Sequence, residues 1–275
     1  MTRPRGTPVE ALSRGALRAG PPAVVLALAL AGWYAFSHVA LAPGRQFLLP
    51  PPERVVREGF LDPANRAELL AALAVSARVA LTGLAVAAVV GVAVAVLMSQ
   101  ARWLERSLYP YAVVLQTIPI LAMVPLFGFW LGFGFPARVL VCVLIALFPI
   151  IANTLFGLRS AEGGQHDLFT LHGAGRITRL VKLQLPAALP ATLTGLRISA
   201  GLSVVGAIVG DFFFRQGERG LGILIDIYRA RLQSERLFAA VILASLFGIA
   251  VFWLFGLFSR RAAAWHESTQ DIATR

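Results

Sequence analysis

The chain has 275 residues, of which 57% are hydrophobic and only 14% are charged, whereas soluble domains average roughly 25% charged residues. Too few charges remain to cover a water-soluble globule, so the composition predicts a protein whose solvent is largely the lipid bilayer. The net charge of +11 does not indicate a nucleic-acid partner, because the arginines lie between apolar runs and form no basic stripe.

Long apolar runs predict an all-α, polytopic membrane protein with six transmembrane helices. We expect a cytoplasmic N-terminal tail (1–21), a first transmembrane helix (22–42), an external segment (43–68), a core of five transmembrane helices (69–261) with a cytoplasmic loop at 159–190, and a cytoplasmic C-terminal tail (262–275). The predicted spans are 22–41, 69–99, 108–131, 136–158, 193–214 and 237–258.

The first apolar run has two interpretations. Four arginines precede it and Ala40-Leu41-Ala42 resembles a cleavage site, as in a signal peptide. However, Pro43 disfavours processing, and the run is longer than the ~7–15 apolar residues of a signal peptide. We therefore expect an uncleaved first span with the N-terminus inside, which places both termini and the 159–190 loop in the cytoplasm. The distribution of Lys and Arg has the right sign for this orientation but only a small bias.

Prolines mark two further features. Pro50–Pro52 break any helix in the external segment, after which Val55, Val56 and Phe60 predict a short helix lying at the membrane interface. The third predicted span contains three prolines, which cause kinks that are tolerated where helices pack or line a cavity.

The most informative polar interruption is the basic segment 167–190, with the sequence DLFTLHGAGRITRLVKLQLPAALP. Asp167 is expected near a helix start, Gly173 at a tight turn, and Pro186 and Pro190 where the helix ends before the next one begins. The helix is amphipathic, so the segment is either a docking element for a soluble partner or a helix resting on the inner leaflet among lipid phosphates. Its basic face comprises Arg176, Arg179 and Lys182, and its apolar face comprises Ile177, Leu180, Val181 and Leu183.

The sequence lacks the motifs of an enzyme, and we expect no catalytic residue, cofactor or metal. It has no H-E-x-x-H, no G-x-S-x-G and no clustered metal ligands. The only lysine, Lys182, lies outside any G-x-x-x-x-G-K-[ST] loop, so the chain is not a P-loop ATPase. Cys142 is the single cysteine and is expected to be a small buried apolar residue.

The basic segment resembles the "EAA" loop of the permease subunits of bacterial ABC importers, in which E-A-A, three residues, G, nine residues and I-x-L-P follow in order. Asp167 occupies the first place, Gly173 the glycine, and Leu183-Gln184-Leu185-Pro186 the last motif, although the Glu-Ala-Ala part does not match. LQTIPILAMVPLFGFWLGFG, LFPIIANTLFGLRS and LPAALPATLTGLRIS are similar to the nitrate/sulfonate/taurine-type branch, which includes thiamine-precursor and riboflavin-type importers.

The resemblance implies a type I ABC importer permease fold, with 69–261 as the permease core. It implies three protein partners: an ABC ATPase subunit, an extracytoplasmic solute-binding protein and a second permease copy, which most simply makes a homodimer. It also implies that this chain lies in the inner membrane of a bacterial cell, in contact with its lipid. It also implies that the basic segment is the coupling element that seats on the ATPase. The residues carried over are Asp167, Gly173, Arg176, Arg179, Leu185 and Pro186.

Polar groups at membrane depth are the candidates for a solute pathway. They are Gln116 and Thr117 in the third span, Asn153 and Thr154 in the fourth, and Ser203 and Asp211 in the fifth. Three of these residues also have an alternative role in helix packing. Asn153 and Thr154 would then form hydrogen bonds between helices, and Asp211 would pair with Arg215 one turn later. Arg78 either snorkels or meets a carboxylate on a neighbouring helix.

The segment from Arg215 to Arg236 is external in this topology, and its glycine-rich start followed by an apolar helix resembles the outer gate helix of the family. Its charges either meet a solute-binding protein or form a solvated face. The sequence thus predicts an importer permease that passes a small organic or anionic solute by ATP-driven alternating access. The alternative is a secondary transporter driven by an ion gradient.

Overall fold

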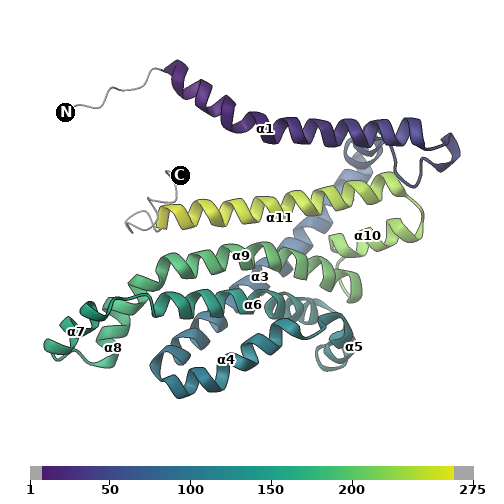
Figure 1. Ribbon diagram of the computed structural model, residues 1–275. Helices are drawn as coiled ribbons and strands as arrows, with labels where there is room; N and C mark the ends of the chain where they lie inside the picture. Colours follow the sequence, from purple (N-terminus) through teal and green to yellow (C-terminus); the bar gives the residue numbers. More distant parts are fainter. Residues whose placement is uncertain (1–7, 263–275) are drawn as a thin grey trace. The chain divides into compact units, whose positions relative to one another are not determined.

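The computed structural model describes residues 8–262, and these residues are helices joined by short loops, without a strand (Figure 1). The all-α prediction is therefore confirmed for this part of the chain. The longer helices are α1 (Pro8–Ala35), α3 (Pro63–Gln100), α4 (Arg102–Thr117), α5 (Ile120–Leu131), α6 (Phe135–Leu158), α7 (Gly163–Leu171), α9 (Leu185–Phe213), α10 (Leu221–Ala230) and α11 (Ser234–Ala262).

Shorter elements connect them. These are η1 (Phe36–Ala40), η2 (Pro43–Arg45), α2 (Pro52–Arg54), η3 (Val55–Leu61), α8 (Arg176–Arg179) and η4 (Leu180–Gln184). The short helix predicted after the proline run is present as η3. The chain forms two compact units: one comprises the residues up to Arg66 with Tyr228–Ala239, and the other comprises Ala67–Ile227 with the residues from Ala240 on.

In the first unit, the loop after α1 folds back on the end of that helix. The Trp33 indole N–H donates to the Pro50 carbonyl (3.0 Å), the Ser37 hydroxyl donates to the Leu49 carbonyl (2.8 Å), and the Trp33 ring lies 5.7 Å from that of Phe238. Asn65, which is buried, donates to the Gly59 carbonyl and accepts from the Tyr228 hydroxyl at 2.8 Å. These contacts fix the folded conformation of the segment 43–62 within this unit.

Within residues 8–262, five helices are long and apolar enough to cross a membrane, and a bent pair makes up to six spans. Four of the five long helices match predicted spans closely, at Gly20–Ala40, Pro63–Gln100, Phe135–Leu158 and Ser234–Ala262. The fifth, Arg176–Phe213, begins far earlier than predicted, and the bent pair replaces the third predicted span.

The third span is not one helix. α4 and α5 are bent by 100° at the break between Thr117 and Ile120. Ile118 is extended (φ −62°, ψ 127°), as the ring of the following proline requires, and Pro119 has no N–H to continue the helix. Pro110 and Pro125 lie inside α4 and α5 without breaking them. The sequence predicted kinks at all three prolines of one continuous span, and this is wrong at Pro119, where the helix is interrupted.

The prolines at 186 and 190 do not end a helix, which corrects the sequence prediction. Helical backbone continues from Arg176 to Phe213. The π-helical turn of η4 precedes the proline, and the Leu185 N–H reaches back five residues to the Leu180 carbonyl. Pro186 then stands in the first turn of α9, where its missing N–H costs little, and Pro190 is accommodated inside the helix.

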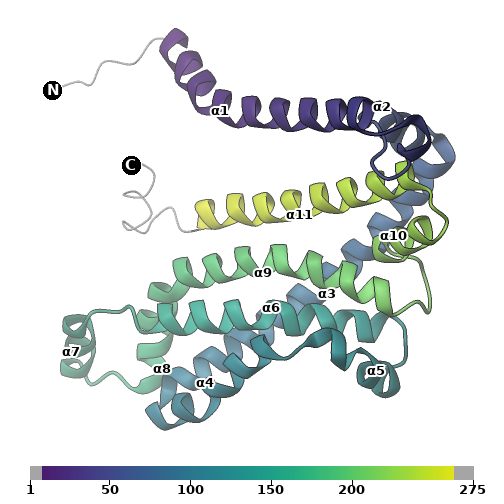
Figure 2. The same cartoon turned by 45° about the vertical axis from the view of Figure 1, so that its right-hand side comes forward.

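α6 and α9 lie side by side along most of their length (Figures 1 and 2). Glycines permit this approach: a Cβ added at Gly195 would lie 2.7 Å from the Pro149 carbonyl oxygen, and one at Gly206 would lie 2.9 Å from the Cys142 Cα. From the α6 side, a Cβ at Gly157 would lie 2.8 Å from the Ala188 Cα. Small residues at contact points are how membrane helices pack without a hydrophobic driving force between them.

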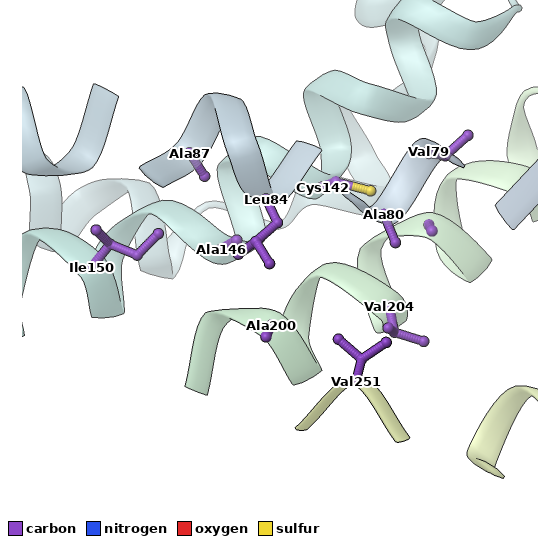
Figure 3. Close-up of a cluster of buried hydrophobic side chains, with 11 residues drawn as sticks. Val79, Ala80, Leu84, Ala87, Cys142, Ala146, Ile150, Ala200, Val204 and Val251 are labelled. Atoms are coloured by element: carbon purple, nitrogen blue, oxygen red, sulfur yellow. The ribbon is translucent and has the colours of Figure 1, made fainter. Parts of the chain in front are cut away.

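The main core of the second unit joins α3, α6, α9 and α11 (Figure 3). Leu84 and Ala87 of α3 face Ala146 and Ile150 of α6, and Val251 of α11 packs beside Val204 of α9. Cys142 is fully buried in this cluster, as the sequence predicted.

Candidate functional site

The basic segment folds as two short helices that extend from one end of the α6–α9 pair (Figure 2). Glu162 caps the start of α7: its side chain accepts from the backbone N–H of Gln165, and the Gln165 side chain accepts from the Glu162 N–H at 3.2 Å. Asp167 lies in the second turn of this nine-residue helix, so the expectation that it stands near a helix start was wrong; Glu162 has that position.

The turn between α7 and α8 is built on Gly173. Its φ of +64° is left-handed, where a side chain would be strained, and its N–H donates to the Thr170 carbonyl at 3.0 Å. Arg179 donates from α8 back to the Thr170 hydroxyl at 2.9 Å. The predicted turn at Gly173 is confirmed, and the two arms of the segment are joined side chain to side chain.

α7, the turn at Gly173, α8 and η4 together form a helical hairpin, the basic hairpin (163–184). Its tip presents large apolar side chains. Leu171 is 82% exposed and Ile177 is 79% exposed, with Leu168 and Val181 also more than half exposed. Arg176 and Lys182 are exposed beside them, but Arg179 is turned inward, so the basic face is narrower than predicted. Leu180 packs instead against the core that includes Leu158 and Ala188. Leu185 is exposed and Pro186 half-buried.

The base of the hairpin is tied to a third element. Arg159, directly after α6, forms an ion pair with Glu105 in the first turn of α4. The base of the hairpin is therefore connected to α4 as well as to α6 and α9.

A buried polar network lies at the other end of the α6–α9 pair. The Arg138 side chain, 2% exposed in the first turns of α6, donates from Nε to the Phe214 carbonyl (2.8 Å) and from its terminal nitrogens to the Gln216 and Glu218 carbonyls (2.9 Å each). It also lies 3.1 Å from an oxygen of Asp211. One guanidinium thus holds the whole loop that connects α9 to α10.

Asp211 is fully buried and its second oxygen accepts from the Ser76 hydroxyl of α3. The same hydroxyl accepts from the Leu221 N–H at 2.8 Å, at the start of α10. A Cβ added at Gly220 would overlap the Asp211 carboxylate, so the loop approaches the carboxylate as only a glycine backbone can. α3, α6, α9 and α10 therefore meet on one buried ion pair.

This geometry corrects the proposed pairing of Asp211 with Arg215. Arg215 pairs with Asp226 of α10 instead, because the side chain of Asp211 points into the bundle, toward Arg138. Arg78 meets the carboxylate of Glu218, which lies in the loop and not on a neighbouring helix.

The other candidate pathway residues separate into two groups. Gln116 lines a mostly apolar cavity of about 240 Å³ with Pro149, and Asn153 donates to the Pro149 carbonyl of its own helix at 2.8 Å, not to another helix as the alternative had it. Thr117 is exposed and donates to the Val114 carbonyl. Thr154 and Ser203 are buried, the latter donating to the Ala200 carbonyl of its own helix, and the Thr154 hydroxyl has no partner among the described residues.

The sequence analysis missed Arg138, Ser76 and Glu162. The sequence did contain a signal for Arg138: it is an arginine one turn inside an apolar span, and a charge there costs free energy unless it is paired. Nothing in the local sequence marks Ser76, which is 135 residues from Asp211. Among the described residues, no three His, Cys, Asp or Glu side chains gather as metal ligands would.

Comparisons with known proteins place these features in context. A family model described as "Binding-protein-dependent transport system inner membrane component" matches residues 87–264. The chain is 35% identical over 211 residues to the formylaminopyrimidine transport permease protein ThiX of Halalkalibacterium halodurans (76% of this chain, 82% of the relative). It is 31% identical to the putative aliphatic sulfonates transport permease protein SsuC of Escherichia coli (80% and 81%) and 29% identical to the nitrate import permease protein NrtB of a Synechocystis strain (80% and 81%).

Proposed function

This chain belongs to the family of inner-membrane components of binding-protein-dependent transport systems, and from that membership we propose that its basic hairpin is the docking element for an ATPase subunit. The chain is a multi-pass membrane permease subunit of an ATP-driven importer. It is not itself catalytic: a separate subunit hydrolyses ATP, and a solute-binding protein delivers the cargo. Family membership decides against the ion-gradient alternative.

The observation that supports docking most strongly is the exposed apolar tip of the hairpin. Leu171 and Ile177 stand out from the bundle and are left uncovered by residues 8–262, and the exposed cations Arg176 and Lys182 flank them. An apolar centre with a charged rim has the composition of a protein interface rather than of a helix lying flat on lipid. Asp167, Gly173, Arg179, Leu185 and Pro186 are assigned to the same element, as its shape-determining residues.

The helix continuity from Arg176 to Phe213 supports a lever mechanism. A force on the hairpin would be transmitted directly to α9, because the helical backbone between them is unbroken. The ion pair between Arg159 and Glu105 would transmit it to α4. ATP binding by the partner subunits would close them, move two such hairpins and turn the cavity outward; hydrolysis would return it. The two hairpins belong to two copies of this chain, which enclose the pathway together.

We assign the cargo to the class of small organic or anionic solutes, since the relatives are named for formylaminopyrimidine, aliphatic sulfonates and nitrate. Gln116, which lines a cavity with Pro149, Asn153, which donates to the Pro149 carbonyl, and the exposed Thr117 beside Gln116 are the pathway residues that we favour. Thr154, Ser203 and Asp211 would act by shaping the bundle, because their side chains are buried. Both termini and the hairpin are assigned to the cytoplasm.

Ile177→Asp tests the docking assignment. The side chain is 79% exposed, so the substitution leaves folding intact but places an unpaired carboxylate at the centre of the interface. We expect co-purification of the cognate ATPase subunit to fall by at least about tenfold, as for an interface hot spot, with the yield of permease unchanged. Leu232→Asp, at another exposed leucine (72%) in the loop between α10 and α11, is the control. Equal ATPase recovery with both variants would refute the assignment.

A further inference from the structure

An apolar groove runs between α9, α11 and the end of α10, away from the packed α6–α9 interface. Its volume is about 540 Å³, and it opens on side chains that are about half exposed, including Val205, Ile249 and Trp253. The walls include Gly201 and Val204 of α9 and Gly248, Ile249, Phe252 and Trp253 of α11.

Glycines widen this groove rather than bringing helices together. A Cβ added at Gly201 would come no closer than 3.9 Å to Phe252, and one at Gly248 no closer than 3.7 Å to Val204. Both distances are ordinary van der Waals contact. Gly195 and Gly206, which face α6, instead allow approaches of 2.7–2.9 Å. The glycines on the α11 side therefore leave space that no side chain of the described residues fills.

A positive charge closes one end of the groove. Arg197 lies one turn before Gly201 on the same face of α9, and its guanidinium stacks on the Phe252 ring at 4.2 Å. Its Nε is enclosed beside Gly256 and has no hydrogen-bond partner among residues 8–262. Arg197 is thus a cation inside a membrane span with no carboxylate paired to it in the described chain, an arrangement that demands a counter-ion.

We propose that the groove is a binding site for an anionic phospholipid, with the phosphate at Arg197 and one acyl chain along Gly201, Ile249 and Trp253. Basic pockets between membrane helices bind anionic headgroups, and guanidinium matches a phosphate with two parallel hydrogen bonds. Gly256 is one turn, about 6 Å, from Arg260 near the end of α11, so Arg197 is within reach of the headgroup level on the hairpin side.

A second copy of the chain fits this groove less well. It would have to supply a carboxylate opposite Arg197. Among the described residues of this unit, the carboxylates at the hairpin end are Glu105, which already pairs with Arg159, and Glu162 and Asp167, which lie on the hairpin itself and not beside the groove. A lipid phosphate supplies the missing charge without any such requirement.

The experiment uses the full permease with its ATPase subunit in nanodiscs. Four of the five tryptophans of the permease, and those of the ATPase subunit, are replaced by Phe so that Trp253 is the tryptophan that reports. Acyl-chain-brominated phosphatidylglycerol is compared with brominated phosphatidylcholine as a quencher. We expect half-maximal quenching of Trp253 at about fivefold lower mole fraction of the anionic lipid, the preference that one basic residue near the surface gives. Arg197→Gln should remove this preference, and Arg197→Lys should keep most of it.

Matched variants separate the site from general surface charge. Arg261→Gln, at an exposed arginine in the last turn of α11 that does not line the groove, should leave the preference unchanged. Gly201→Leu, which fills the groove, should weaken quenching by both lipids, whereas Gly32→Leu, with open space around its Cβ, should not. Equal quenching by the two lipids with the wild-type chain would overturn the proposal. So would the absence of quenching by either lipid, which would mean that a second copy covers the groove.

Discussion

Single residues carry a large part of the architecture at the end of the bundle opposite the hairpin. Arg138 and Asp211 are both almost fully buried, yet each has its charge paired and its remaining hydrogen-bonding atoms partly satisfied by backbone or by Ser76. The net stabilisation by such a pair is small, because desolvation offsets the attraction between the charges. The loss of one partner, however, leaves an uncompensated charge in a dry environment.

Arg138→Met is accordingly expected to destabilise the permease by about 3–5 kcal/mol, the usual cost of breaking a buried pair. Thermal or denaturant unfolding of the purified protein measures this. Arg219→Met is the matched control, since that arginine is exposed and its nitrogen lies 3.9 Å from Glu68; it should change stability by less than about 1 kcal/mol. Similar effects of the two variants would contradict the network's importance.

At the scale of elements, α9 presents glycines to two different neighbours with different consequences. Toward α6, Gly195 and Gly206 permit backbone approach, and toward α11, Gly201 leaves open space. The same residue type therefore has two structural roles on one helix, and only the distance to the neighbouring helix distinguishes them.

Gly206→Ala should destabilise the protein by about 1–3 kcal/mol, because its methyl group would push α6 and α9 apart. Gly201→Ala should be neutral or stabilising by up to about 1 kcal/mol, since alanine favours helix and the added Cβ meets no close atom. Parallel unfolding curves of the two variants provide the measurement. If Gly206→Ala were as stable as Gly201→Ala, the close packing of α6 and α9 would be in question.

At the scale of the whole molecule, the hairpin and the Arg138 network lie at opposite ends of the same two helices. α6 enters the network with Arg138 and ends at the hairpin, and α9 runs in the reverse direction to Asp211. Because glycine contacts hold the two helices close along their length, we expect a movement at the hairpin to displace the loop before α10. This is the physical link between the proposed ATPase contact and the proposed outer gate.

The orientation across the membrane follows as a prediction. Two single-cysteine variants are made in a Cys142→Ala background and treated with a membrane-impermeant maleimide. Leu171→Cys should be labelled in inside-out vesicles but not in intact cells. Arg219→Cys should be labelled in cells whose outer membrane has been permeabilised and whose inner membrane is intact. Both positions are exposed, so in vesicles prepared without the ATPase subunit their accessibility depends on the side of the membrane alone. The reverse labelling pattern would make ATPase docking at the hairpin impossible.

Local physical chemistry made several features predictable from sequence. The fourth span was predicted at 136–158 and is found at Phe135–Leu158, because hydropathy along one helix requires no knowledge of its neighbours. The turn at Gly173 was predictable for a similar reason, since glycine is the residue that adopts a left-handed conformation without strain. The family motif around it added the ATPase as a partner, which hydropathy alone would not have done.

The amino-acid sequence by itself thus determined the membrane location, the positions of four apolar spans and the position of the basic hairpin, all of which depend on residues close together in the chain. The tertiary structure alone decided that Pro119 breaks its span while Pro186 does not, and that Asp211 meets Arg138 rather than Arg215. The physical reason is distance along the chain: Arg138 and Asp211 are 73 residues apart, and a buried charge is paired by whichever partner the packing of helices brings to it.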